Sequence, residues 1–260
     1  MPLETPTLPP ATRTNTYVAG VHRACVVDPA PSGDEPRAEL LAYLRALQSR
    51  GVELSALVLT HHHRDHVGAT AFLARELHLP VWAHAETASR VDFHVDHLLD
   101  DGQPLPCDGP SWTSVFTPGH APGHLCFHRP EGGFLVAGDM LTGVGSVLVD
   151  PDEGSMRLYL QSLRRLEALD PAVVLPAHGP SMVPGVVHVR HHLAHRTARS
   201  SAVLARVVAG DRTPADMVPH IYAGTPPAMF PFAERSVMTM LIQHREEGRV
   251  VERDGQWLPA

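Results

Sequence analysis

The segment from Thr60 to Val67 is dense in side chains that bind metal ions. It reads Thr-His-His-His-Arg-Asp-His-Val and directly follows the apolar run Leu57–Leu59, at the exit of an expected strand. The side chains concerned are those of His61, His63, Asp65 and His66. Neutral imidazole and carboxylate are ligands that zinc and similar divalent ions prefer. In a packed core, each of these polar groups would instead need a hydrogen bond. The cluster therefore predicts a metal site at the end of a strand.

Length and composition narrow the class of protein. A chain of 260 residues with 43% hydrophobic residues is long enough for one large domain, or for a main domain with a small appendix. The formal net charge of −7 argues against a general nucleic-acid binder, which is usually basic. Every basic residue is arginine. Without a lysine, Schiff-base chemistry and a P-loop are both excluded.

The cysteines and the N-terminus indicate a reduced compartment. Cys25, Cys107 and Cys126 are widely spaced and form no Cys-x-x-Cys pair, which favours neither a disulfide framework nor a thiolate zinc site. We expect Cys25 and Cys126 to be buried thiols. Residues Met1–Arg13 are rich in Pro and Thr and lack the apolar core of a signal peptide. No apolar stretch approaches the roughly 20 residues that span a bilayer. These features predict a soluble, cytoplasmic protein without a membrane partner.

Strands and helices alternate along the first part of the chain. Hydrophobic periodicity predicts helices at 35–50, 69–79 and 156–169, and strands at 16–19, 24–27, 56–59, 81–83, 114–117, 125–128, 134–137 and 173–175. The polar segment 89–99 is interpreted as a loop or lid. Each potential metal ligand follows a strand, where α/β proteins build their sites.

After about Gly185 the pattern changes to three helices and a hairpin. The first helix is expected at 188–209, and Thr213-Pro214 starts the second, because Thr caps a helix and Pro suits its first turn. A third helix at 233–245 precedes two short strands joined by Asp254-Gly255. This order is typical of a winged-helix module.

The residues that follow the strands resemble the motifs of the metallo-β-lactamase superfamily across residues 15–185. The motif His-x-His-x-Asp-His at 61–66 is highly specific, and Gly119-His120, Gly138-Asp139 and His178-Gly179 follow it in the family's order. The resemblance implies an αββα sandwich of two mixed sheets with helices outside, and a site at one sheet edge. We therefore expect a metallo-β-lactamase-like catalytic domain at 1–185 and a winged-helix domain at 186–260.

The same resemblance implies a cofactor of two divalent ions, with zinc expected and iron or manganese as alternatives. Their ligands would be His61, His63 and His120 for one ion, Asp65, His66 and His178 for the other, and Asp139 between them. Two such charges would turn a shared water into a hydroxide nucleophile. Asp65 is the candidate catalytic residue that orients this hydroxide and moves its proton. We interpret His62 as a bystander and His124 as a structural hydrogen-bonder.

Within the superfamily, the closest resemblance is to lactamase-like hydrolases with a C-terminal winged helix. Residues 117–124, Tyr159–Leu163, His195-Arg196 and Glu247–Val250 resemble phrases of that subgroup. Some of its members cleave single-stranded RNA and others hydrolyse carrier-bound thioesters. Asp139 stands where lactamases with a Cys ligand have sulfur, which disfavours an antibiotic-lactamase role. The absence of lysine also disfavours the glutathione substrate of glyoxalase II.

The leading hypothesis is a dinuclear metal hydrolase acting on an ester or thioester of a small or carrier-bound acyl group. The alternative hypotheses are a single-strand-specific endoribonuclease and a persulfide dioxygenase with one iron. A hypothesis from another class is a winged-helix binding protein on an inactive lactamase-like body, which would read DNA with the third helix. That helix offers Arg235, Gln243, His244 and Arg245. The sequence leaves the oligomeric state open.

Three further residues are candidates for substrate binding. Gly145 and Ser146 lie in a Gly-rich stretch after Asp139 that either shapes a substrate groove or simply connects two elements. Arg196 would meet a phosphate or carboxylate, or else form an ion pair within the protein. We expect the C-terminal domain to wall off one side of the cleft.

Overall fold

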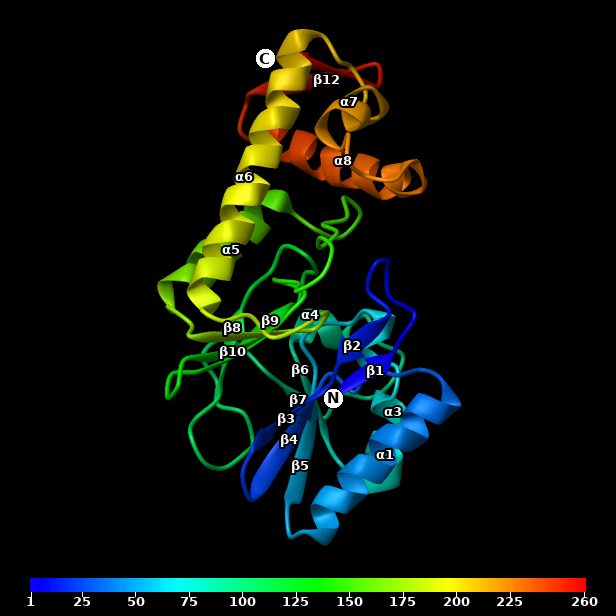
Figure 1. Ribbon diagram of the computed structural model, residues 1–260, viewed down its shortest axis with the longest axis vertical. Helices are drawn as coiled ribbons and strands as arrows, with labels where there is room; N and C mark the ends of the chain where they lie inside the picture. Colours follow the sequence, from blue (N-terminus) through cyan, green and yellow to red (C-terminus); the bar gives the residue numbers. More distant parts are fainter.

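Two mixed β-sheets pack face to face in the computed structural model, which describes residues 1–260 (Figure 1). The N-terminal sheet has the order β3-β4-β5-β6-β7, with β3 antiparallel to β4 and the other pairs parallel. Its strands are β3 (Tyr17–Gly20), β4 (Arg23–Val27), β5 (Glu53–Val58), β6 (Val81–Ala83) and β7 (His97–Leu98).

The C-terminal sheet has the order β11-β10-β9-β8, in which β9 is antiparallel to both neighbours and β10 is parallel to β11. Its strands are β8 (Thr113–Phe116), β9 (Leu125–Arg129), β10 (Phe134–Gly138) and β11 (Val173–Pro176). The helices of this part of the chain are α1 (Asp34–Ser49), α2 (Arg64–Val67), α3 (Thr70–Leu77), α4 (Ala85–Ala88) and α5 (Met156–Ala168).

The alternation of side chains along the strands explains the four layers. In β4, Cys25 and Val27 pack against Phe127 of the opposite sheet, whereas Val26 packs with Leu40 of α1 on the outer face. Successive strand side chains point to opposite faces, so a strand that is apolar at every position must be covered on both sides. On the outer face of the C-terminal sheet, β9 and β10 pack in the same way against α5. The predicted αββα sandwich is confirmed.

A helical domain follows the sandwich and lies at one end of it (Figure 1). It comprises α6 (Gly185–Ala209), α7 (Pro214–Ile221), the 3₁₀ turn η1 (Pro227–Met229), α8 (Phe230–Glu246) and the hairpin of β12 (Val250–Arg253) and β13 (Gln256–Pro259). Thr213 caps α7 in a reciprocal capping box with Asp216, as its sequence predicts. Helices, hairpin and order match the predicted winged helix.

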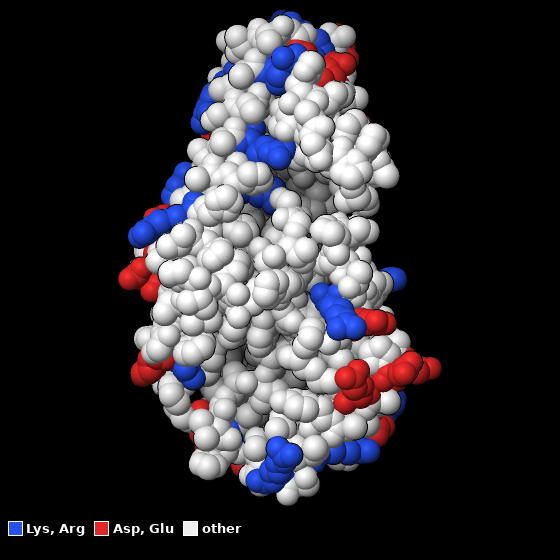
Figure 2. Space-filling model, in the orientation of Figure 1, with Lys and Arg blue, Asp and Glu red and all other residues white.

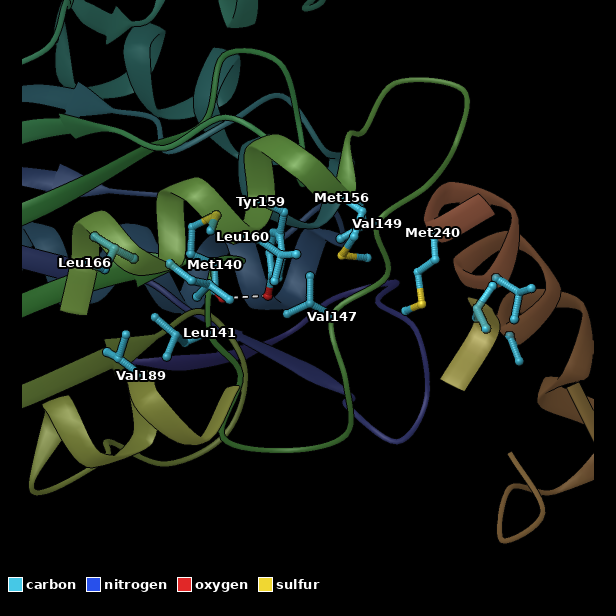
Figure 3. Packing of buried hydrophobic residues seen from close by; sticks show 14 of the residues in the cluster. Met140, Leu141, Val147, Val149, Met156, Tyr159, Leu160, Leu166, Val189 and Met240 are labelled. Carbon is cyan, nitrogen blue, oxygen red and sulfur yellow. Dashed lines mark hydrogen bonds between the residues drawn. The ribbon is translucent and has the colours of Figure 1, made fainter. Parts of the chain in front are cut away.

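The core of the C-terminal domain is continuous with the core behind the C-terminal sheet. Val149 and Met156 of the sandwich belong to one buried cluster with Met240 of α8, and Figure 3 shows these side chains at the junction. Helix α6 packs on α5 and β11 as well as on α7 and α8. The division at residue 185 coincides with the start of α6 and stays a prediction, because this helix belongs to both cores.

Three local features differ from the expected elements. The N-terminus, where no strand is predicted, forms a hairpin of β1 (Pro2–Glu4) and β2 (Arg13–Asn15), anchored by the buried Leu3. The helix expected at 69–79 is present as α3, but a short helix that is not predicted, α2, precedes it, and the two are separated at Gly68, where a Cβ would lie 2.6 Å from the Ala30 carbonyl oxygen. Segment 89–99 contributes the short β7.

Two predictions about the chain as a whole can also be compared with the structure. The three cysteines are free, and Cys25 and Cys126 are buried, as predicted. None of the helices combines the length and the apolarity needed to traverse a bilayer.

Candidate metal centre

The predicted ligands come from four separate segments that end at one edge of the sandwich. His61 and His63 follow β5, and α2 presents Asp65 and His66 one turn later. The others follow the turn after β8, the end of β10 and the end of β11, and are His120, Asp139 and His178. The structure brings these residues into three overlapping groups of three whose ligand atoms lie within 4.8 Å of one another, and the group that contains Asp139, with His61 and His66, links the other two.

The first group, here called triad 1, is His61, His63 and His120. Nδ1 of His63 lies 2.9 Å from Nε2 of His61 and 3.0 Å from Nε2 of His120. The far nitrogen of each ring has its own partner. His63 Nε2 donates to Glu153 Oε1 at 2.6 Å, His120 Nδ1 donates to the Leu148 carbonyl at 2.7 Å, and His61 Nδ1 lies 2.9 Å from Thr60 Oγ1.

The second group, triad 2, is Asp65, His66 and His178, with Asp139 between the two triads. Asp139 Oδ1 lies 3.5 Å from His66 Nε2 and 3.3 Å from His178 Nε2, while its Oδ2 lies 3.5 Å from His120 Nε2. Asp65 Oδ2 lies 3.6 Å from His178 Nε2. One carboxylate oxygen of Asp139 therefore faces each triad.

The hydrogen-bond partners show that these residues fit divalent cations. A carboxylate and a backbone carbonyl only accept, so the partnered nitrogens of His63 and His120 must hold the ring protons. The nitrogens that face each other in triad 1 are then unprotonated, and a shared cation would satisfy them. In triad 2, His66 Nε2 and Asp139 Oδ1 are buried without a hydrogen-bond partner. A buried polar atom without a partner is costly unless a ligand satisfies it.

The two triads differ in charge. Burial and the neighbouring imidazoles together lower the pKa of His61 well below its usual value and that of His120 to about 4. Burial also opposes charge on His66, but the carboxylates of Asp139 and Asp28 raise its pKa well above the usual value. Triad 1 thus consists of imidazoles alone, whereas triad 2 combines imidazoles with a carboxylate. Both donor sets suit borderline divalent ions.

Asp28, the residue directly after β4, supports His66 and the turn that carries His61, and the sequence does not predict this role. Its Oδ1 accepts the backbone N–H of Thr60 at 2.7 Å, and its Oδ2 accepts the Thr60 hydroxyl at 2.7 Å and His66 Nδ1 at 2.8 Å. The side chain is buried. Like the ligands, Asp28 directly follows a strand, and this position is the only signal in the sequence that points to it.

Glycines allow two ligand turns to pack closely against other groups. Gly119, directly before His120, has φ of +138°, and a Cβ there would lie 2.3 Å from the backbone nitrogen of Tyr159. Gly138, directly before Asp139, has φ of +49°, and a Cβ would lie 2.6 Å from His124 Nε2. Only glycine tolerates both requirements. The backbone conformation and the close packing therefore explain why glycine precedes the ligand in the Gly-His and Gly-Asp motifs.

His62 and His124 lie beside the triads and have different roles. His124 accepts the backbone N–H of Asp139 at 3.1 Å and donates to Thr117 Oγ1 at 2.9 Å, which agrees with the structural role predicted for it. His62 lies outside both triads but is not a bystander, because its Nε2 lies 3.0 Å from Glu153 Oε2. Hydrogen bonds from His62 and His63 lower the pKa of Glu153 well below its usual range, although burial opposes this shift. Glu153 gave no signal in the sequence.

Comparison with known proteins identifies the family. The profile of the Metallo-beta-lactamase superfamily matches residues 9–178, and that of the Beta-lactamase associated winged helix domain matches residues 213–257. The chain belongs to the metallo-β-lactamase superfamily. The predictions of a hydrolase of this fold and of a C-terminal winged helix are confirmed.

Relatives match both parts of the chain. Lactamase-like protein adaB from Aspergillus niger is 30% identical over 257 residues, which cover 90% of this chain and 77% of that protein. Atrochrysone carboxyl ACP thioesterase AgnL7 from Paecilomyces divaricatus is 33% identical over 193 residues, which cover 74% of this chain and 58% of that protein. The crystal structure of the metallo-beta-lactamase family protein TTHA1429 from Thermus thermophilus superposes with a TM-score of 0.81 at 25% identity, covering 100% of this chain and 97% of that one.

A cavity of about 260 Å³ opens onto both triads. Its walls come from the ligands, from the N-terminal loop Pro6–Ala11 and from residues between β10 and α5. Figure 1 shows the loop between β1 and β2 projecting toward the C-terminal domain. Four carboxylates line the cavity and no arginine does; they are those of Asp65, Asp139, Asp150 and Glu153. In this superfamily member, the site is thus a narrow acidic cavity with an apolar rim.

The structure changes the interpretation of the candidate substrate-binding residues. Ser146 lines the cavity, but Gly145 and Arg196 do not. Gly145 instead faces the N-terminal loop, where a Cβ would lie 2.8 Å from Pro10 Cδ. Arg196 is only 3% exposed, and its guanidinium donates to Ser146 Oγ and the Val147 carbonyl. Arg196 therefore supports the cavity wall from behind, because burial keeps it away from a substrate.

The residues of α8 that are expected to contact DNA bases make contacts within the protein. Gln243 and His244 are buried, and His244 Nε2 donates to the Ser200 carbonyl at 2.7 Å. Arg245 pairs with Glu252, and Arg235 pairs with two aspartates of the sandwich. All four residues expected to contact bases are thus occupied within the protein.

Proposed function

We propose that this protein hydrolyses acyl thioesters, in which a carrier or small thiol bears the acyl group, with the help of two divalent cations, expected to be zinc. The cavity is the observation that supports this proposal most directly. It joins the two triads to an apolar wall that includes Leu8, Val144 and Leu148, and it lacks arginine side chains. Such a wall suits an acyl chain, and the name of the relative AgnL7 describes an ACP thioesterase.

The charge of the cavity argues against RNA as the substrate. Binding of a nucleic-acid backbone depends on Lys and Arg near the phosphates. Here the cavity walls include carboxylates but no guanidinium. On the face shown in Figure 2, several arginines lie over the C-terminal domain with a few acidic side chains among them, and the middle of this face is largely uncharged. Two bound divalent cations would offset the carboxylates, so it is the lack of guanidinium groups that could bind the rest of a phosphate backbone that disfavours RNA.

The residues of the site divide the work of hydrolysis. Triad 1 and triad 2 would hold the cations, and Asp139 would lie between them. When bound, two divalent cations supply a water nucleophile at neutral pH and polarise the substrate carbonyl. Asp65, which lies in the cavity wall and is part of triad 2, would orient the attacking water and accept its proton at a carboxylate oxygen. Leu8 and Leu148 would exclude water from the acyl group.

The first experiment compares substrates on the purified full-length protein. Acyl thioesters of pantetheine and of a carrier protein, aryl esters and a fluorogenic single-stranded RNA are assayed before and after treatment with a chelator. We expect thioester hydrolysis that the chelator abolishes and that added Zn²⁺ restores. His63→Ala should lower kcat/KM by at least about 10³-fold, because one ligand of triad 1 is lost. His94→Ala is the matched control, since this histidine is 83% exposed and far in sequence from the ligands.

Two outcomes would overturn the proposal. Cleavage of RNA without thioester hydrolysis would assign the site to a nuclease. Metal analysis that finds a single iron per chain, with consumption of oxygen on a persulfide substrate, would assign it to a dioxygenase.

A further inference from the structure

The segment between β10 and α5, residues 141–154, is here called the support loop. It provides the hydrogen-bond acceptors for two histidines of triad 1, at the ring nitrogens that face away from the triad. The Leu148 carbonyl accepts His120 Nδ1 at 2.7 Å, and Glu153 Oε1 accepts His63 Nε2 at 2.6 Å. The second oxygen of Glu153 lies 3.0 Å from His62 Nε2. The carboxylate is therefore held between two adjacent imidazoles and orients the ring of a metal ligand.

The support loop has no helix or strand of its own, so other parts of the protein must fix its position. The C-terminal domain does this through α6 and α8. Arg235 of α8 forms ion pairs with Asp150 and Asp152, and the Thr239 hydroxyl donates to the Val149 carbonyl at 2.6 Å. Arg196 of α6 adds hydrogen bonds to Ser146 and Val147 of the same loop.

Apolar packing reinforces these polar contacts. Val147 and Val149 of the support loop are buried and belong to the same cluster as Met240 of α8. Figure 3 shows both valines on the segment that runs between α5 and the C-terminal domain. A loop with buried side chains and a bidentate arginine clamp has few alternative positions.

We propose that Glu153 is a positioning residue for triad 1, and that Arg235 of the winged-helix domain acts through it by fixing the support loop. The C-terminal domain then belongs to the metal centre, because it sets the orientation of His63 and His120. This inference rests on the metal-binding part of the proposed function and is independent of the substrate.

The chemistry of a carboxylate behind a ligating imidazole gives the expected size of the effect. A carboxylate that accepts the outer N–H of such an imidazole fixes its tautomer and increases the basicity of the ligating nitrogen. Loss of a partner of this kind typically lowers metal affinity by about 10- to 100-fold. Triad 2 has its own partners, Asp28 for His66 and the Arg13 carbonyl for His178, and should not change.

The test measures the binding of Co²⁺ alone to the metal-free full-length protein. Visible absorption of Co²⁺ and competition with a chelator give the affinity of each of two equivalents. We expect Glu153→Gln to weaken one equivalent by about 10- to 100-fold and to leave the other unchanged. Arg235→Ala should weaken the same equivalent by a smaller factor, and Arg235→Lys, which keeps the charge but not the bidentate geometry, should fall between it and the unmutated protein.

Arg157→Ala is the matched control. Arg157 of α5 pairs with Glu246 of α8 at 3.2 Å, so it also joins the two parts of the protein, but its side chain forms no hydrogen bond or ion pair with the support loop. It should leave both equivalents unchanged. Circular dichroism of each metal-free variant establishes that it is folded.

The outcomes separate this inference from the proposed function. If the unmutated protein binds no Co²⁺, the metal site of the proposed function fails. If it binds two equivalents and Glu153→Gln binds both equally well, the role of Glu153 is refuted. If Arg157→Ala weakens Co²⁺ binding as much as Arg235→Ala does, general docking of the domain rather than the arginine clamp is responsible.

Discussion

In the N-terminal layer, from β3 to β7, one buried carboxylate supports His66 and the backbone at Thr60, whereas in the C-terminal layer, from β8 to β11, His120 and His178 each depend on a separate backbone carbonyl. Asp28 alone accepts three hydrogen bonds from Thr60 and His66. In the other layer, His120 donates to the Leu148 carbonyl and His178 to that of Arg13. Support is thus concentrated in one layer and distributed over several segments in the other.

This difference determines which substitutions each layer can tolerate. A single substitution of Asp28 removes all three hydrogen bonds that its carboxylate accepts. A backbone carbonyl cannot be removed by substitution, so the C-terminal layer is vulnerable mainly where its turns require glycine. The ligands of the N-terminal layer are also adjacent in sequence, while those of the other layer are held together only by the fold. The following predictions test this contrast.

The largest effect is expected for Asp28→Ala. The substitution leaves the N–H and hydroxyl of Thr60 and the Nδ1–H of His66 buried without an acceptor. Breaking a buried, hydrogen-bonded charge pair typically costs about 3–5 kcal/mol. We expect a loss of that size in the free energy of unfolding from urea denaturation, with loss of metal at triad 2. Asp28→Asn keeps the size of the side chain and should recover part of the stability. A loss below about 1 kcal/mol in the alanine variant would contradict concentrated support.

Gly119→Ala is expected to be the most damaging small substitution in the C-terminal layer. Its Cβ would lie 2.3 Å from the backbone nitrogen of Tyr159 at φ of +138°, so either the turn before His120 or the start of α5 must move. We expect about 3 kcal/mol of destabilisation and displacement of His120 from triad 1. Gly224→Ala is the control, because a Cβ there meets nothing within 4 Å. Equal unfolding midpoints for the two variants would show that the turn adapts.

The same contrast explains how much of the site the sequence could predict. His61, His63, Asp65 and His66 are recognisable because one turn after β5 presents them all. His120, Asp139 and His178 are recognisable only as short Gly-containing motifs in a fixed order. The groups that hydrogen-bond to these ligands form no motif that can be recognised in the sequence. Glu153 lies far along the chain from His63, and the Leu148 carbonyl exists whatever the residue at that position.

Elements of the fold follow the same logic. Apolar periodicity predicts most strands and the longer helices of the sandwich, because their buried side chains recur with the period of the element. The N-terminal hairpin escapes prediction because β1 and β2 are three residues each and only alternate Leu3 and Thr14 are buried. Arg196 escapes correct interpretation because a basic residue on a helix looks the same in sequence whether it faces a substrate or a buried carbonyl.

The smallest effect is expected at Tyr159. Its hydroxyl donates to the Met140 carbonyl at 2.8 Å, which is one more of the separate backbone contacts in the C-terminal layer (Figure 3). Burial raises the pKa of this phenol from 10.0 to about 12. Because the folded state resists ionisation, the stability that Tyr159 contributes is fully present below pH 10 and decreases as the pH rises toward 12.

The variant Tyr159→Phe tests this prediction, because it lacks both the hydrogen bond and the ionisable group. At pH 8 the phenylalanine variant should be less stable by about 1 kcal/mol. At pH 11 the unmutated protein should have lost about 1 kcal/mol relative to this variant, so that the two unfolding curves converge. Urea denaturation of both proteins at the two pH values measures this difference, and a constant gap would mean that Tyr159 does not titrate differently on folding.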